Sequence, residues 1–75
     1  MKLVANEYTP QDIVKIIREW TELTQKDFGE SIQRTERSIR TLESGSRHLT
    51  VETLIKICNA HNIEVIIQKK DNTQK

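Results

Sequence analysis

Apolar residues recur at the spacing of an amphipathic helix over most of this chain. The first stripe follows Thr9-Pro10-Gln11-Asp12, which combines a threonine cap, a proline at the first helical position and an acid in the first turn. The stripe consists of Ile13, Ile16, Ile17 and Trp20. This spacing predicts a helix with one face in the core, where Trp20 and Phe28 are expected to be the largest side chains.

A short second helix is predicted from Thr24 onward. Thr24 can cap it, and Asp27 lies in its first turn. Leu23 precedes the cap at the position from which it can pack against Phe28. We expect this helix to end by Ile32 and a tight turn to follow.

A third helix is predicted from Thr35, whose hydroxyl can cap a free amide of the first turn, to Gly45, which can adopt the left-handed conformation favoured at a helix end. Ile39 and Leu42 point to one side of this helix. The opposite face gathers polar residues, namely Glu36, Arg37, Arg40, Thr41 and Ser44. This is an unusual set for a helix that contacts nothing.

A last helix is predicted after Leu49-Thr50, which repeats the arrangement of an apolar residue directly before a threonine cap. This helix is expected to end near Asn62. Its apolar stripe consists of Leu54, Ile57, Cys58 and His61. From Ile63 the period changes to a β-branched alternation, which predicts a strand over residues 63–70. A strand needs a hydrogen-bonded partner, either residues 2–5 or the same strand of a second chain, and we favour both. The expected dimerisation residues are Ile63, Val65, Ile66 and Ile67.

The length of 75 residues indicates one domain with a modest core, which dimerisation would help to stabilise. We expect an N-terminal arm or short strand over 1–9, a helical domain over 10–62, the strand over 63–70 and a flexible tail over 71–75. The net charge of +1 does not by itself indicate nucleic acid. Basic side chains nevertheless cluster in one stretch, namely Arg34, Arg37, Arg40, Arg47 and His48. This stretch is either a nucleic-acid contact or an ordinary solvated surface.

Several classes of protein are not expected. The single cysteine cannot form an internal disulfide, no leader precedes the domain and no apolar run is long enough to cross a bilayer, so we expect a cytoplasmic protein without membrane contact. Cys58 and His61 share a helix face but are too few for a zinc site, and they are interpreted as a core thiol and a partly buried histidine. No glycine-rich loop is present to hold a nucleotide. We therefore expect no metal, no cofactor and no enzymatic activity.

The two central helices resemble those of a known family, the Cro/C1-type helix-turn-helix repressors, also called XRE-like regulators. The resemblance covers Pro10 to Ile63, and its specific part is Leu23-Thr24-Gln25, Gly29 where the helices cross, Ile39 and Glu43-Ser44-Gly45, all in register. The chain departs from the family at Gln33 and Arg34, where a glycine and an apolar residue are usual, and at Leu42, where tryptophan is common. Either Gln33 adopts a geometry that glycine adopts more easily, or the turn differs locally from that of the family.

The resemblance implies a mainly α, compact lambda-repressor-like domain of four to five helices that binds double-stranded DNA. Its third helix would enter the major groove, where the expected base-reading residues are Glu36, Arg37, Arg40 and Thr41. The expected phosphate-binding residues are Gln25, Thr35, Ser38, Ser44, Ser46 and Arg47. Glu43 matches a structural position of the family, and Glu36 is expected to pair with Arg40 one turn on. The linker 46–48 either follows the DNA backbone, as in the family, or is a plain surface loop.

These features predict a dimeric repressor of its own operon or of a mobile-element operon. It would bind an inverted repeat with half-sites about 34 to 36 Å apart. Arg40→Ala is expected to weaken binding to the cognate site far more than to random DNA, whereas Gln25→Ala should weaken both. The alternative is a protein-binding module that neutralises a toxin or an antirepressor protein. The last helix and the strand, Leu49 to Lys70, give a looser similarity to HipB-type antitoxins.

Overall fold

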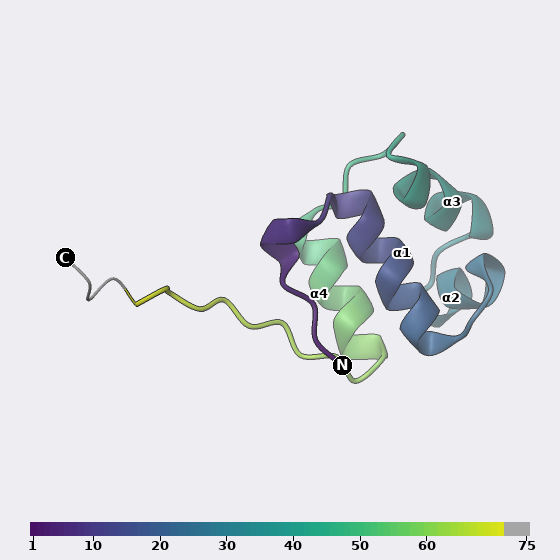
Figure 1. Ribbon diagram of the computed structural model, residues 1–75. Helices are drawn as coiled ribbons and strands as arrows, with labels where there is room; N and C mark the ends of the chain where they lie inside the picture. The colour runs from purple at the N-terminus through teal and green to yellow at the C-terminus, as the bar shows by residue number, and fades with distance from the viewer. Residues whose placement is uncertain (72–75) are drawn as a thin grey trace.

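The computed structural model describes residues 1–71, and four α-helices account for most of that part of the chain. They are α1 (Pro10–Thr21), α2 (Gln25–Ser31), α3 (Glu36–Ser44) and α4 (Val51–Ala60), and a single 3-10 turn, η1 (Ala5–Glu7), precedes them. Figure 1 shows α2 and α3 beside one another on one side of α1, with α4 on the other side. The predicted mainly α domain is confirmed.

Each α-helix begins after a threonine whose hydroxyl oxygen accepts a hydrogen bond from the backbone N–H three residues further on. The four caps are Thr9, Thr24, Thr35 and Thr50. Such a cap stabilises a helix by about 1 kcal/mol relative to alanine. All four predicted helix starts are therefore confirmed, and the physical cause is local to each segment.

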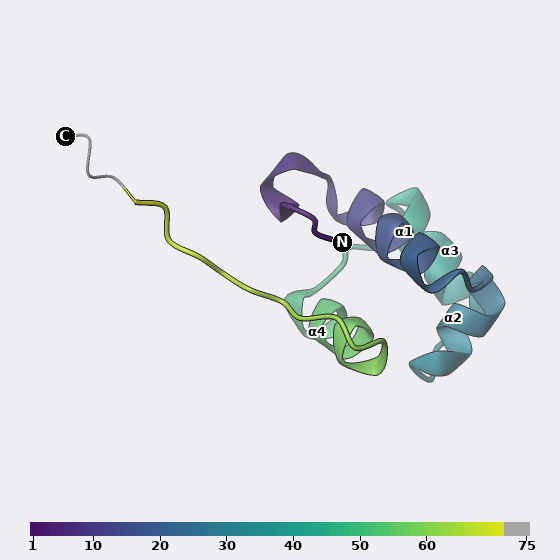
Figure 2. The same cartoon turned by 60° about the horizontal axis from the view of Figure 1, so that its bottom comes forward.

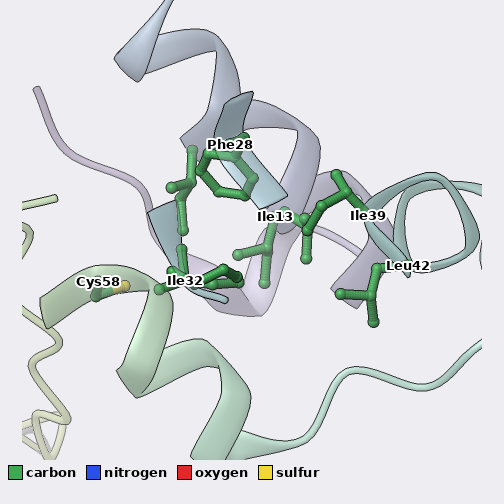
Figure 3. Packing of buried hydrophobic residues seen from close by; sticks show 9 residues of the cluster. Ile13, Phe28, Ile32, Ile39, Leu42 and Cys58 are labelled. Atoms are coloured by element: carbon green, nitrogen blue, oxygen red, sulfur yellow. The ribbon is translucent and has the colours of Figure 1, made fainter. Parts of the chain in front are cut away.

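One apolar cluster holds the helices together (Figure 3). Phe28 of α2 belongs to this cluster and is completely buried, as predicted. Trp20 is only partly buried and packs against the edge of the cluster, so the expectation that it is a main core residue is only partly met. The buried residues are Ile13, Val14, Ile17, Phe28, Ile32, Ile39, Leu42, Ile57 and Cys58.

The turn between α2 and α3 determines how α3 is oriented relative to α2. Its backbone is closed by the N–H of Arg34, which donates to the carbonyl oxygen of Gly29 at 2.7 Å. Gln33 has a φ of 61°, which lies in the left-handed region. The unusual geometry expected for Gln33 is therefore confirmed.

Replacing Gln33 with glycine should stabilise the domain. A non-glycine residue in the left-handed region costs about 1 to 2 kcal/mol, while glycine loses more backbone entropy on folding, so the expected net gain is about 0.5 to 1 kcal/mol. Urea denaturation measures it. Gln33→Ala is the matched control and should give no gain, because alanine has the same steric conflict; an equal gain from alanine would show that the side chain, and not the backbone angle, is unfavourable.

The two ends of the chain differ from the prediction. Residues 2–5 do not form a strand, because the chain folds into η1, where the N–H of Glu7 donates to the carbonyl oxygen of Val4 at 3.0 Å. Pairing between the N-terminal segment and residues 63–70 was therefore a wrong expectation. Residues 63–71 have no regular secondary structure and extend away from α4 (Figures 1 and 2). Four residues of the predicted flexible tail, 72–75, lie outside the described residues.

α4 is joined to α2 through a few side chains. The imidazole of His61, at the end of α4, stacks on Phe28 with ring centroids 5.1 Å apart, and its Nε2 lies 2.8 Å from Oγ of Ser31. The guanidinium of Arg34 donates to Oγ1 of Thr53 at 3.3 Å. Burial raises the pKa of the Cys58 thiol. Cys58 and His61 therefore have the structural positions predicted for them, as a core thiol and a partly buried histidine.

Candidate nucleic-acid interface

The outer face of α3 carries the predicted base-reading residues. Glu36, Arg37 and Arg40 are exposed, whereas Thr41 is half-buried. Ile39 and Leu42 on the opposite face are buried in the core, and this packing fixes the rotation of α3 about its own axis. α3 therefore presents a polar surface to the exterior while its apolar stripe anchors it.

Glu36 and Arg40 form an ion pair across one helical turn. Nη2 of Arg40 donates to Oε2 of Glu36 at 3.1 Å, as predicted. Because both side chains are exposed, the pair contributes little to stability. Its larger effect is geometric, since it restricts the guanidinium of Arg40 and neutralises an acid that would otherwise repel a nearby phosphate.

Arg37 and Thr41 lie on the other flank of this face, beside the loop that follows α3. Together with four of the predicted phosphate-binding residues they line a shallow hollow, whose lining consists of Thr35, Arg37, Ser38, Thr41, Ser46 and Arg47. The hydroxyl of Thr41 donates to the carbonyl oxygen of Ser38 at 2.9 Å, so its own proton is committed within the helix. Oγ of Ser38 is buried and has no hydrogen-bond partner among the described residues.

The loop after α3 folds back onto the end of the helix. Gly45 has a φ of 85°, the left-handed geometry predicted for this helix end, and the N–H of Arg47 donates to the carbonyl oxygen of Thr41 at 3.2 Å. Oγ of Ser44 lies 2.9 Å from Oγ of Ser46. These bonds hold the exposed side chain of Arg47 beside α3.

Gln25 lies apart from this hollow. Its Nε2 donates to Oε1 of Glu43 at 3.1 Å, and Glu43 also accepts two bonds from Arg18, from Nε at 2.5 Å and from Nη2 at 3.1 Å. Nη1 of Arg18 donates to the carbonyl oxygen of Leu23 at 3.0 Å. The internal ion pair expected for Glu43 is confirmed, and it ties α1, α2 and α3 together.

The charge state of Glu43 follows from these bonds. Burial alone would raise the pKa of its carboxyl, but the hydrogen bonds from Arg18 and Gln25 and the positive charge of Arg18 outweigh burial and lower that pKa. The bond to Glu43 likewise raises the pKa of Arg18. Both side chains are therefore charged at neutral pH, and the ion pair links α1 to α3 inside the domain.

The role of Arg18 was not predicted from the sequence. Arg18 lies 25 residues before Glu43, and its only local signal is a basic residue in the last turn of a helix, which many helices carry. Arg34 was counted with the basic stretch, but its guanidinium bonds to Thr53 of α4. The predicted site residues thus form three groups. One lines the hollow, with Ser44 at the rim of that hollow; the second is the Glu36–Arg40 pair; and the third is Gln25, which belongs to the internal network.

Four capped helices, a tight turn and an anchored helix with a polar outer face define a helix-turn-helix protein. A profile of the helix-turn-helix family matches residues 14–67, and the chain belongs to this family, as a Cro/C1-type, XRE-like member. Comparison with curated proteins and with solved structures gives no match. The looser similarity to HipB-type antitoxins is not confirmed.

The family supports DNA binding and transcription regulation in general, and it is not an enzyme family. The described residues hold no group of three or more His, Cys, Asp or Glu side chains placed to bind a metal ion. Within residues 1–71, no helix has the length and apolar character that crossing a membrane requires.

Proposed function

We propose that this regulator is a dimeric repressor that reads the major groove of an inverted-repeat operator with α3, in its own operon or in that of a mobile element. The observation that carries this proposal is the exposed polar face of a helix that its apolar stripe anchors to the core. Such a helix fits the major groove of B-DNA, where each base pair presents a different pattern of donors and acceptors. Action on an operator would take place in the cytoplasm, where the DNA is.

The proposed base contacts follow from the donors and acceptors that each side chain leaves free. One bond from Nη2 of Arg40 to Glu36 leaves a two-donor edge of the guanidinium available for the two acceptors of guanine. The second carboxylate oxygen of Glu36 can accept from a cytosine amino group. Arg37 can bind a second guanine. Thr41, whose proton is committed to Ser38, offers its methyl group to thymine or its oxygen lone pairs to a base amino group.

The proposed phosphate contacts lie around this face. The loop residues Ser46 and Arg47 and the start of α3, with Thr35 and Ser38, line the hollow into which a phosphate oxygen would fit. Ser44 lies at the rim. Gln25 would contact a phosphate with the amide that bonds to Glu43 in the free protein, so this contact needs a hydrogen-bond exchange.

Arg40→Ala is expected to reduce affinity for the cognate operator about 10- to 100-fold, since a bidentate base contact discriminates by about 1 to 3 kcal/mol, and to change affinity for random DNA far less. Arg47→Ala is the matched control, because both side chains are exposed and cationic. It should weaken both DNAs equally and lower the salt slope by about 0.9. Titrations of both variants on both DNAs measure this, and equal losses for Arg40→Ala would refute its base-reading role.

The decisive experiment is fluorescence anisotropy of the purified protein on DNA from upstream of its own gene and on a scrambled duplex, across a salt series. Tight, sequence-dependent binding with a steep salt dependence is the expected result. Footprinting should then reveal two half-sites related by a two-fold axis. Weak and equal binding to both duplexes would refute the proposal and favour a protein partner, a toxin or an antirepressor, with residues 63–68 as the first surface to test.

A further inference from the structure

The ion pair between Glu36 and Arg40 lies on the outer face of α3. The side chain of Glu36 is 46% exposed and that of Arg40 is 56% exposed, so the edge of a base can reach both. Ile39, which is completely buried, fixes the rotation of α3 and thereby keeps the pair on the outside. The two side chains differ from Arg37 and Thr41 on the other flank, because they are joined to each other before any DNA is bound.

The bond between the two side chains determines the order of their hydrogen-bonding groups. A guanidinium has two edges that each present a pair of N–H donors, one edge formed by Nη1 and Nη2 and the other by Nε and Nη2. Nη2 belongs to both edges, and it is Nη2 of Arg40 that donates to Oε2 of Glu36 at 3.1 Å. Whichever edge stays free therefore has Nη2 next to the carboxylate. The pair thus presents a row of donor, donor and acceptor.

This row matches the major-groove edge of a G·C base pair, taken in the direction from guanine to cytosine. Guanine presents two acceptors there, N7 and O6, and cytosine follows with one donor, its N4 amino group. O6 and N4 are joined by a Watson–Crick hydrogen bond and therefore lie about 2.9 Å apart. The distance of 3.1 Å between Nη2 of Arg40 and Oε2 of Glu36 is close to this value. Both the order and the spacing of the groups thus fit one base pair.

The other three base pairs do not match this row. An A·T pair presents acceptor, donor and acceptor in either direction, so the central donor of the row faces a donor and the carboxylate faces an acceptor. A C·G pair, taken from cytosine to guanine, presents donor, acceptor and acceptor, so the first donor faces a donor and the carboxylate again faces an acceptor. Each wrong base pair therefore opposes two of the three groups that Glu36 and Arg40 present.

We infer that Glu36 and Arg40 read a single G·C base pair of the operator as one unit, with Arg40 on guanine and Glu36 on the cytosine of the same pair. This rests on the proposed function, because it specifies a contact made by an α3 that reads DNA. Two separate base pairs would draw the side chains apart and leave the carboxylate of Glu36 without a cation near phosphates, which repel it. In the shared contact Nη2 donates one proton to Glu36 and the other to O6 of guanine, so the ion pair stays intact.

Base-pair scanning of the operator tests the shared contact. Each position of a half-site is changed to all four base pairs, and the affinities of the wild type, Glu36→Ala and Arg40→Ala are measured by fluorescence anisotropy. At one position the wild type should prefer G·C, in one orientation, by about 10-fold or more over each alternative, and both variants should lose this preference at that same position. Arg37→Ala is the matched control. It removes an exposed cation from the other flank of α3 and should keep the preference there.

Modified bases at that position test the two contacts atom by atom. Pyrimidin-2-one in place of the cytosine removes the amino group and should weaken binding of the wild type about 10-fold, but should not weaken binding of Glu36→Ala. In place of the guanine, 7-deazaguanine removes the N7 acceptor and should weaken binding of the wild type but not of Arg40→Ala.

Each readout compares two duplexes bound by the same variant, so a general loss of affinity does not affect it. Preferences lost at two different positions, or lost in only one of the two variants, would overturn the inference and leave the proposed function intact. A wild-type chain without a base preference at any position would overturn both.

Discussion

Gly29→Ala is expected to destabilise the domain by about 3 kcal/mol and to abolish binding to the operator. A Cβ atom on Gly29 would lie 2.9 Å from the carbonyl oxygen of Thr35 and 3.0 Å from that of Arg34. Both are backbone atoms that lead into α3, so relief would require the turn to open. Forced overpacking typically costs about 1 to 3 kcal/mol and occasionally more, and here, where the clash is with backbone atoms that cannot rotate away, we expect about 4 kcal/mol. The gain of about 1 kcal/mol that alanine brings to an open helix site reduces this to about 3 kcal/mol.

Thermal and urea denaturation measure this loss, which corresponds to a fall in Tm of about 10 °C or more. Gly45→Ala is the control. It introduces left-handed strain, but its Cβ would meet only the end of the flexible Gln11 side chain, 3.1 Å from Nε2, so the expected cost is smaller, about 1 to 2 kcal/mol. A more stable Gly29→Ala variant would show that α2 and α3 are not in close contact at this position.

Arg18→Met is expected to cost about 2 to 3 kcal/mol of folding free energy at neutral pH. It leaves the carboxylate of Glu43, whose side chain is 5% exposed, without its charge partner. Removal of one partner from a buried ion pair costs about 3 to 5 kcal/mol, and the lower figure applies here because the side chain of Arg18 is 21% exposed. The double variant Arg18→Met with Glu43→Leu should recover most of the loss, since it buries no charge.

The same pair gives the stability a predictable pH dependence. Because the folded protein lowers the pKa of Glu43, the stabilisation is complete above about pH 4.3, the ordinary pKa of glutamate, and is lost as the pH falls through the lowered value. Urea denaturation from pH 7 to pH 3 should therefore show a steeper acid loss for the wild type than for Glu43→Gln. Parallel curves would mean that Glu43 does not contribute to acid sensitivity.

Most of the local structure could be predicted from the sequence, because its causes lie within a few residues. The four threonine caps and the left-handed ends at Gln33 and Gly45 are examples. The polar face of α3 also follows from helical periodicity alone. A cap or a turn depends on residues that are adjacent in the sequence, so these predictions needed no knowledge of tertiary contacts.

Predictions that depended on distant segments fared less well. Arg18 and Gln25 meet at Glu43 only after three helices have packed, so neither spacing nor composition indicates the network. The N-terminal strand was wrong because the folding of Ala5–Glu7 into a 3-10 turn competes with extension. The strand predicted over residues 63–70 has no regular secondary structure in the single chain, because a β-branched alternation by itself supplies no hydrogen-bonded neighbour.

The sparse attachment of α4 divides the molecule into parts of unequal local stability. α1, α2 and α3 share Phe28, Ile39 and the internal ion pair, whereas α4 is held mainly by two buried side chains and the bonds at its ends. Helices with fewer buried contacts open below the free energy of global unfolding. In hydrogen exchange, the amides of α4 should therefore exchange faster than those of α3, so that α4 can open while the exposed face of α3 stays folded.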